Sequence, residues 1–192
     1  MSVLSATGAG VRHRRRWIFR DLDVTVEPGE SVAVVGPQGS GRTTVLLALA
    51  ERFRLSAGSV TLSGTAALGY VPDAYQPEPL FTVAEHVTER LALLGRSPRD
   101  AVDLLGLDPG RRGWELTPYQ KQVLGLVLAG LSEPRVIALD GIDDGLDVHE
   151  QDELWGLLDA IAADGVAVLV TARAVDPARV TTVIRLGEGE QS

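Results

Sequence analysis

The chain has 192 residues, a formal net charge of −8, 45% hydrophobic residues and 23% charged residues. These values are typical of a soluble globular protein of one domain, or of one domain with a small inserted subdomain. Cysteine is absent, which excludes disulfides and thiolate metal sites. The acidic balance argues against a nucleic-acid partner held mainly by phosphate contacts, and we expect the basic run His13–Arg16 to be a solvated edge.

Neither a membrane span nor a secretory leader is expected from the hydropathy. The apolar runs are short, such as Val166–Val170, whereas a spanning helix needs roughly 18 consecutive apolar residues. No apolar segment precedes the arginines near the N-terminus, as a signal peptide would require. We therefore expect a cytoplasmic protein.

The first third of the chain predicts a strand, a glycine loop and a helix in succession. Polar and apolar residues alternate over Leu22–Val26, which indicates a strand exposed on one face. Ser31–Val35 is a continuous apolar run, typical of a strand buried on both faces. A helix is predicted from Arg42 to about Phe53.

The remaining elements alternate between short buried strands and helices. Strands are predicted at Gly58–Leu68 (one or two), Gly69–Val71, Arg135–Leu139, Val166–Val170 and Thr182–Leu186, and helices at Val83–Leu94, Arg99–Leu105, Thr117–Leu131 and His149–Ala163. This alternation favours an α/β fold with a mainly parallel sheet and crossover helices. We expect a single domain over 1–192, with an inserted helical subdomain at about 82–131.

The glycine loop fits the pattern of a phosphate-binding loop at every position except the lysine. Glycines let backbone N–H groups surround phosphate oxygens, and the following helix directs its positive dipole end at the same anion. Arg42 replaces the lysine in a chain with 17 arginines and one lysine, so this exchange means little by itself. An accidental glycine turn is the alternative. The predicted nucleotide-binding residues are Gly36, Pro37, Gln38, Gly39, Ser40, Gly41, Arg42, Thr43 and Thr44.

An acidic residue closes the strand Arg135–Leu139. Asp140 stands where a phosphate-loop NTPase commonly orders its Mg²⁺, and Thr43 would offer a hydroxyl to the same ion. Read alone, Asp140 would instead be a helix N-cap or a turn aspartate.

Several segments in the right order resemble the ATP-binding cassette (ABC) family. Leu139–Asp147, LDGIDDGLD, is similar to the family's LDEPTSGLD, and Leu116–Asp140 matches the signature-to-Walker-B stretch without a gap. Val26–Glu30 resembles the approach to the phosphate loop, and Gly69–Pro72 the Q-loop segment. The resemblance extends from about Val11 to Leu186 and implies a P-loop NTPase fold of ABC type, with antiparallel strands on the N-terminal side.

The resemblance also implies ligands and partners. It assigns ATP and Mg²⁺ as cofactors, with Thr43, Asp140 and Asp73 around the metal. It places Thr117, Gln120 and Asp147 opposite the nucleotide of a second cassette, in a homodimer or a heterodimer. An integral membrane permease would hold the chain at the inner face of the membrane.

The sequence departs from the family pattern at the positions that the family uses for catalysis. The catalytic glutamate position is Gly141, and the switch histidine position is Arg173, or Ala172 if the register slips by one. The three histidines, His13, His86 and His149, lie elsewhere. Losing one transition-state group typically costs on the order of 10²–10³ in rate, so we predict no catalytic residue and weak or absent hydrolysis at this chain's own site.

Other departures concern the loops around the nucleotide. Asp73 replaces the Q-loop glutamine, for which Gln76 substitutes only if the loop is slipped by three residues. In the signature, Pro118 has no N–H and Tyr119 adds bulk, although Thr117 and Pro118 also suit the start of a helix.

Three functional classes remain open at this point. They are a transporter subunit, a nucleotide-binding regulator without a pump, and a cassette for DNA repair or chromosome maintenance. The third lacks the expected heptads. For adenine contact the register favours His13 or its neighbours, and Trp17 is the nearest aromatic residue.

Overall fold

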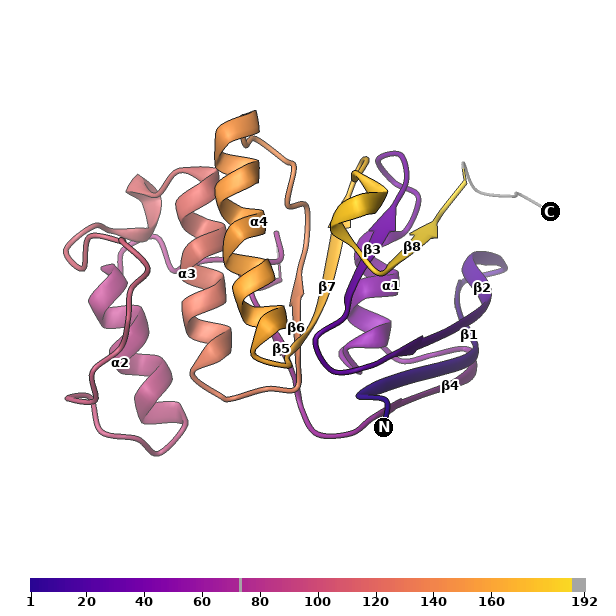
Figure 1. The fold of residues 1–192 in the computed structure, drawn as a ribbon, viewed down its shortest axis with the longest axis horizontal. Helices are drawn as coiled ribbons and strands as arrows, with labels where there is room; N and C mark the ends of the chain where they lie inside the picture. The colour runs from indigo at the N-terminus through magenta and orange to yellow at the C-terminus, as the bar shows by residue number, and fades with distance from the viewer. Residues whose placement is uncertain (73, 188–192) are drawn as a thin grey trace.

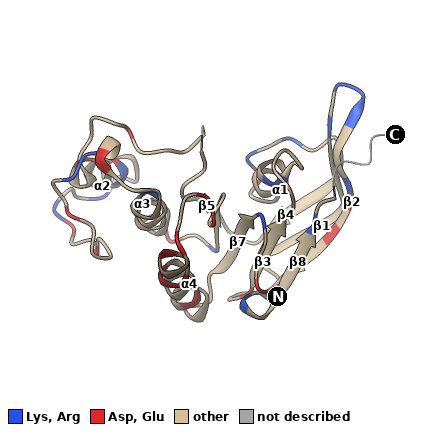
Figure 2. Ribbon diagram, turned by 90° about the horizontal axis from the view of Figure 1, so that it is seen from above, with Lys and Arg blue, Asp and Glu red and all other residues tan. Residues whose placement is uncertain are grey.

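A three-stranded antiparallel sheet forms the N-terminal side of the molecule. In the computed structural model, which describes residues 1–72 and 74–187, the order is β2 (Arg16–Val26), β1 (Leu4–His13), β4 (Ala57–Leu62). All pairs in this sheet are antiparallel, as the family resemblance implied. The basic run His13–Arg16 lies at the β1–β2 hairpin and is exposed. Its arginines are visible as the blue tip in Figure 2.

The second sheet has five parallel strands. Their order is β5 (Ala66–Leu68), β6 (Val136–Leu139), β7 (Ala167–Ala172), β3 (Ser31–Val35), β8 (Thr182–Arg185). Every residue of β3, β6 and β7 is buried. Parallel strands covered on both faces read as continuous apolar runs, which is why the sequence identified these three strands.

Helices and the smaller sheet cover the two faces of this parallel sheet (Figure 1). Helix α1 (Arg42–Leu49) and the antiparallel sheet pack on one face, against residues such as Val34 and Leu169. Helices α3 (Pro118–Gly130) and α4 (Val148–Ala163) pack on the other, against Val35 and Val170. The fold is therefore a layered α/β structure with two apolar cores.

The segment between β5 and α3 carries one longer helix, α2 (Val83–Leu93). Thr82 caps it, because its hydroxyl accepts the Glu85 N–H while the Glu85 carboxylate accepts the Thr82 N–H. Val87 and Leu91 of α2 pack against Val127 of α3 in a small apolar cluster. Two 3₁₀ turns, Gly113–Glu115 and Pro177–Arg179, complete the elements of the described ranges.

Three predicted elements differ from the structure. The helix predicted at Arg99–Leu105 is absent; the chain there has a turn with Leu105 in the left-handed region, and the Leu105 N–H bonds to the Asp103 carboxylate. Such local side-chain bonds compete with helix formation. Helix α1 ends at Leu49 rather than near Phe53, because Glu51 is left-handed at φ 56°. The segment predicted as a strand at Gly69–Val71 is not a regular strand: Gly69 and Tyr70 continue the backbone bonding to β6, through Ala138 and Asp140, and Val71 forms an isolated bridge with Tyr75.

No helix within the described residues is long and apolar enough to cross a membrane.

Candidate functional site

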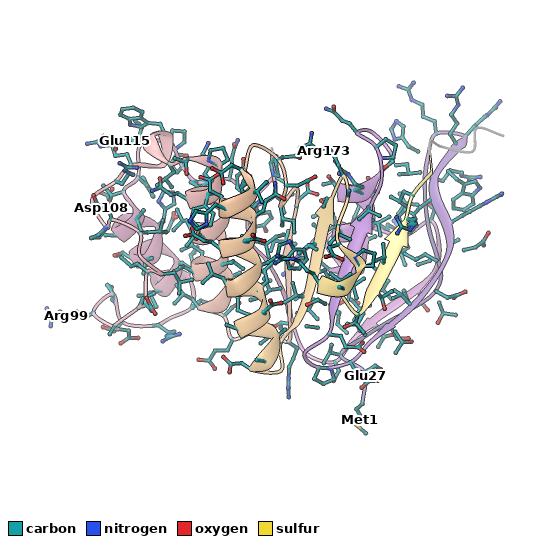
Figure 3. The ribbon with its side chains drawn as sticks, turned by 45° about the horizontal axis from the view of Figure 1, so that its top comes forward. Met1, Glu27, Arg99, Asp108, Glu115 and Arg173 are labelled. Atoms are coloured by element: carbon teal, nitrogen blue, oxygen red, sulfur yellow. The ribbon has the colours of Figure 1, made fainter. Side chains whose placement is uncertain are left out.

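Three neighbouring strands of the parallel sheet end at one edge. Val35 at the end of β3 is paired with Ala172 at the end of β7, and Leu139 at the end of β6 is paired with Val170. The glycine loop, Asp140 and Arg173 therefore follow these strands at the same edge. Arg173 lies at this edge in Figure 3, whereas Glu27 lies at the opposite one. Ligands of open α/β sheets bind outside the carboxyl ends of the strands.

The glycines of the loop are required by its backbone. Gly39 and Gly41 have φ of 80° and 96°, in the region that favours glycine. A Cβ on Gly41 would stand 2.3 Å from Ile18 Cγ2, and one on Gly36 would stand 2.6 Å from the Leu186 carbonyl oxygen. The loop is thus a turn whose backbone and packing require glycine at positions 36, 39 and 41.

The loop and the start of α1 fit an anionic ligand. Among the described residues, Ser40 Oγ and Arg42 Nη1 are buried without a hydrogen-bond partner. Gly41 caps α1 without a side-chain bond, and the first turn of the helix has no acidic residue. Unsatisfied donors at a helix N-terminus, with a cation beside them, are the features that bind phosphate groups.

Asp140 is held by two hydroxyl groups from different elements. Thr43 Oγ1 donates to Asp140 Oδ2 at 2.8 Å, and Thr171 Oγ1 donates to Asp140 Oδ1 at 2.5 Å. Thr171 Oγ1 in turn accepts the N–H of Gly141 at 2.8 Å. Asp140 caps no helix, since α4 is capped by Asp147. With Mg²⁺ bound, Thr43 and Asp140 are the residues that would hold it, and the ion would neutralise phosphate charge.

The third residue predicted at the metal is Asp73. Asp73 lies outside the described residues. Gln76, considered as its substitute, is exposed and lines a cavity of about 540 Å³ beside Tyr75 and His86.

The residue after Asp140 has a backbone that disfavours any side chain. Gly141 has φ 62°, and a Cβ there would lie 2.7 Å from Asp144 Oδ2. Its carbonyl and that of Asp140 accept hydrogen bonds from Gln122 Nε2, at 3.4 and 2.9 Å. Gln122 is fully buried in α3 and connects that helix to the end of β6.

Arg173, the other departure from the family pattern, is bound to the segment after β6. Its main-chain N–H and its Nε both donate to Asp143 Oδ2, at 2.9 and 3.2 Å. Its Nη2 donates to the Asp143 carbonyl oxygen at 3.2 Å. Asp144 Oδ1 lies 3.5 Å from Nε.

The residues expected to face a second cassette all cap helices within this chain. Thr117 Oγ1 accepts the Gln120 N–H at 3.2 Å, and Gln120 Oε1 accepts the Thr117 N–H at 3.1 Å. Pro118 occupies the first helical position, as predicted for a helix start. Asp147 caps α4 by accepting the Glu150 N–H.

Tyr119, at the second position of α3, is half-buried. It packs against the core between the parallel sheet and α4, and against a smaller apolar cluster that includes Val83 of α2 and Val123 of α3. Burial raises the pKa of its phenol, and the Glu153 carboxylate raises that pKa further.

The residues considered for adenine contact have different surroundings. Trp17 packs on Gly10, and Arg12 lies over its ring at 5.6 Å. Ile18, the next residue, is the one that touches the glycine loop at Gly41. His13 is exposed beside Ile18 in a surface hollow, whereas His86 is buried and bonded to the Glu78 N–H and the Thr82 carbonyl.

Sequence reasoning missed three residues that order the site. Thr171 is the one polar residue of β7, and this isolated hydroxyl in an apolar strand was the available signal. Gln122 and Asp143 lie in segments that resemble the family, but the sequence did not assign them a role, because their partners lie 18 and 30 residues away in the chain.

The fold and this site define a P-loop NTPase, with the glycine loop joining β3 to α1 and an aspartate at the end of β6. The sequence model of the family described as ABC transporter matches residues 19–142. The chain belongs to the ABC transporter family.

Relatives and solved structures agree with this assignment. The zinc import ATP-binding protein ZnuC of Jannaschia sp. (strain CCS1) is 34% identical over 155 residues, which cover 77% of this chain and 62% of ZnuC. YbhF of Escherichia coli (strain K12), described as a probable multidrug ABC transporter ATP-binding protein, is 29% identical over 88% of this chain. The chain spans 33% of the length of YbhF. The dimeric structure of MJ0796, a bacterial ABC transporter cassette, has a TM-score of 0.79 at 19% identity and covers 97% of this chain and 95% of that one.

Proposed function

We propose that this chain is the ATP-binding subunit of a bacterial ABC transporter, with weak or absent hydrolysis at its own site. In this proposal Mg-ATP is held by residues 36–44, with Thr43 and Asp140 at the metal. The observation that supports it best is the 2.8 Å bond between Thr43 and Asp140, which joins two motifs 97 residues apart. The chain is a single domain in this proposal, and residues 82–131 form its helical subdomain.

Weak hydrolysis follows from the two positions that should act on the attacking water. Gly141 has no side chain, and Arg173 is engaged by Asp143. Positioned charges and proton acceptors supply most of the rate in phosphoryl transfer. No residue on these two positions offers a general base.

The partners in this proposal are a second cassette and a membrane permease. Thr117, Gln120 and Asp147 would face the nucleotide of the second cassette. The Thr117 hydroxyl accepts the Gln120 N–H within the chain, which leaves its own O–H to donate. The permease would determine the cargo and hold the chain at the inner face of the membrane. The relatives' names, zinc import for ZnuC and multidrug for YbhF, describe those proteins.

The first experiment measures nucleotide binding by titration calorimetry, with Mg²⁺ and with a chelator. We expect binding of Mg-ATP, and turnover near the background rate of ATP hydrolysis. Asp140→Asn should weaken ATP binding in Mg²⁺ and leave ATP binding in chelator nearly unchanged. Only the part of the binding free energy that depends on the metal ion is lost. Asp159→Asn, on the exposed side of α4, is the matched control.

Two results would overturn parts of this proposal. Absence of ATP binding would reject the nucleotide site, and rapid turnover by the isolated chain would reject the weak-hydrolysis part. Copurification with a polytopic membrane protein supports the transporter subunit. A chain that binds ATP without any such partner would favour the alternative, a non-catalytic regulator of ABC type.

A further inference from the structure

The turn of the β1–β2 hairpin carries three consecutive arginines whose side chains have no partner within the described chain. Arg14 and Arg15 form the two-residue turn, and Arg16 begins β2. All three are exposed (Figure 2), and among residues 1–72 and 74–187 none of their guanidinium groups forms an ion pair or a hydrogen bond. The chain has 26 acidic and 18 basic residues, so acidic partners are plentiful elsewhere. Adjacent like charges repel one another, and an anion bound among them would offset that repulsion.

The backbone of this turn is not the one that an arginine prefers. Arg14 has φ 55°, in the left-handed region. Two-residue hairpin turns usually carry asparagine, aspartate or glycine where φ is positive, because longer side chains are disfavoured in that conformation. Strained backbones of this kind gather at binding sites, where the side chain has a role that offsets the strain. The fold alone would favour asparagine or glycine at position 14, so the arginine there points to a role for its charge.

The arginines line a surface hollow that adjoins the phosphate loop. Among the described residues the lining of this hollow consists of His13, Arg14, Arg15, Arg16 and Ile18. Ile18 touches the loop, since a Cβ on Gly41 would stand 2.3 Å from Ile18 Cγ2. Arg16 lies two residues before Ile18 on the same face of β2, about 7 Å away along the strand. Trp17 lies on the other face, with Arg12 over its ring. The hollow therefore presents basic groups next to the loop, and neither tyrosine nor tryptophan lines it.

The arrangement of the strands determines which end of a nucleotide would reach this hollow. Thr43 and Asp140, the residues proposed to hold Mg²⁺, meet at the end of β6. Magnesium bridges the last two phosphates of a bound triphosphate. In the parallel sheet β6 lies on one side of β3 and β8 on the other, and the hairpin lies beyond β8 (Figures 1 and 2). The terminal phosphates would thus lie toward β6, and the sugar would lie toward the hairpin.

We propose that the hairpin arginines bind a second phosphate group, carried on the sugar of a nucleoside triphosphate whose 5′ phosphates occupy residues 36–44. This inference rests on the proposed function, because it requires a nucleotide in that loop. A guanidinium binds a phosphate through two parallel N–H bonds, which makes arginine the side chain suited to this group. Arg16 is the nearest of the three to Ile18 and would make the direct contact, while Arg14 and Arg15 add positive charge at the rim of the hollow.

The position of the hollow favours a nucleotide over a larger polyanion. A membrane surface or a nucleic acid also presents phosphates, and would bind an exposed basic turn at any distance from the loop. The contact between Ile18 and Gly41 instead makes the hollow continuous with the loop proposed for the 5′ phosphates. The net charge of −8 also opposes an extended polyanionic surface, whereas a small ligand depends on the local charge.

Calorimetry compares the binding of Mg-ATP with that of the same nucleotide carrying a phosphate on its 3′ oxygen. The wild-type chain should bind the 3′-phosphorylated ATP about three- to tenfold more tightly, the range expected for charge-assisted bonds at an exposed site. Arg16→Gln should lower this ratio of affinities to about one, because it removes the direct contact. Arg99 is another exposed arginine without a side-chain partner among the described residues, at the opposite end of the molecule (Figure 3). Arg99→Gln should keep the wild-type ratio.

Arg14→Asn separates a role in binding from a role in folding. Asparagine suits the left-handed turn, so this variant should melt about 2–4 °C above the wild type. Its preference for the 3′-phosphorylated nucleotide should fall at the same time, because one positive charge is lost from the hollow. A variant that melts lower and keeps the full preference would show that Arg14 serves the fold and not the ligand.

The same titrations distinguish failure of this inference from failure of the proposed function. A wild-type chain that binds both nucleotides equally well, or an Arg16→Gln variant that keeps the preference, would overturn the inference and leave ATP binding intact. A wild-type chain that binds neither nucleotide would overturn the proposed function, and the inference with it. Binding to phosphatidylglycerol vesicles that requires the arginines, without a preference between the nucleotides, would also overturn the inference and assign the turn to a membrane surface.

Discussion

Three residues after β6 and β7 determine which chemistry the site can perform. Asp140 has both carboxylate oxygens bonded to hydroxyls, of Thr43 and Thr171, which orients it toward the loop between β3 and α1. Gly141 presents only its backbone, and Arg173 is held by Asp143. Thr43 and Asp140, which are proposed to hold Mg-ATP, are thus ordered, whereas positions 141 and 173 carry neither a carboxylate nor an imidazole.

Restoring a glutamate at position 141 should not restore hydrolysis. Gly141→Glu places a side chain at φ 62° with its Cβ 2.7 Å from Asp144 Oδ2. We expect phosphate release to stay at the wild-type level and the free energy of unfolding to fall by about 1–3 kcal/mol, the typical cost of a strained backbone. Phosphate-release assays and urea unfolding measure the two quantities.

A glycine in a helix interior provides the control for this substitution. Gly156 lies in α4, and a Cβ there would meet no atom within 4 Å. Gly156→Ala should raise the free energy of unfolding by roughly 0.5–1 kcal/mol. A Gly141→Glu protein as stable as the wild type, or with increased turnover, would show that the backbone at 141 relaxes.

At the scale of the elements, α3 has two separate connections to the site. Its start is capped by Thr117 and Gln120 and contacts Gly145 through Pro118. Its second turn carries Gln122, which bonds to the carbonyls of Asp140 and Gly141. Movement of α3 would therefore be transmitted to the loop after β6.

The cap of α3 should contribute to stability independently of any partner. Thr117→Ala removes the acceptor of the Gln120 N–H and should lower the free energy of unfolding by about 1 kcal/mol. Thr117→Ser keeps a hydroxyl acceptor and should stay close to the wild type. Chemical denaturation measures both, and an unchanged Thr117→Ala protein would argue against the cap.

The buried amide of Gln122 should contribute more to the free energy of unfolding than the partly buried amide of Gln151. Gln122→Met keeps the volume but leaves two buried carbonyls without their donor, at a cost of about 1–3 kcal/mol. It should also weaken ATP binding, since these carbonyls belong to Asp140 and Gly141. Gln151→Met removes one partly buried bond to the Leu146 carbonyl and should cost about 0.5 kcal/mol or less. Equal losses in the two variants would contradict the positioning role.

At the scale of the whole molecule, a nucleotide in the loop would join several elements that are distant in sequence. The loop connects β3 to α1, Asp140 follows β6, and Thr171 belongs to β7. The acidic side chains of α4 and the arginines of the β1–β2 hairpin lie on different parts of the surface (Figure 2). The net charge of −8 therefore says little about the charge at the loop itself.

Binding of Mg-ATP should raise the melting temperature of the whole chain. A ligand at 100 times its Kd stabilises a native protein by about 2.7 kcal/mol. Arg42→Ala should remove most of this gain, because Arg42 Nη1 is buried without a partner beside the loop. Arg42→Lys keeps the charge and should retain the gain. Differential scanning fluorimetry with and without Mg-ATP measures the shift, and an equal shift in Arg42→Ala would exclude a phosphate contact by Arg42.

The sequence by itself determined where along the chain the buried strands, the glycine loop and the helix starts lie. These features depend on local patterns, such as the apolar run Ser31–Val35 and the Thr117–Pro118 pair, and the structure confirms them. The prediction of a helix at Arg99–Leu105 was wrong, because the Asp103 side chain bonds to the Leu105 N–H and Leu105 has a left-handed backbone. Propensity alone could not weigh these local hydrogen bonds against helix formation.

Only the tertiary structure decided which residues meet at the edge of the sheet. Thr43 reaches Asp140 across 97 residues, and Arg173 reaches Asp143 across 30, because β3, β6 and β7 end side by side. It also decided that the half-buried Tyr119 packs against the core and that Gly141 adopts a left-handed backbone. The local pattern at these positions carries no information on strand pairing, and strand pairing brings these side chains within bonding distance.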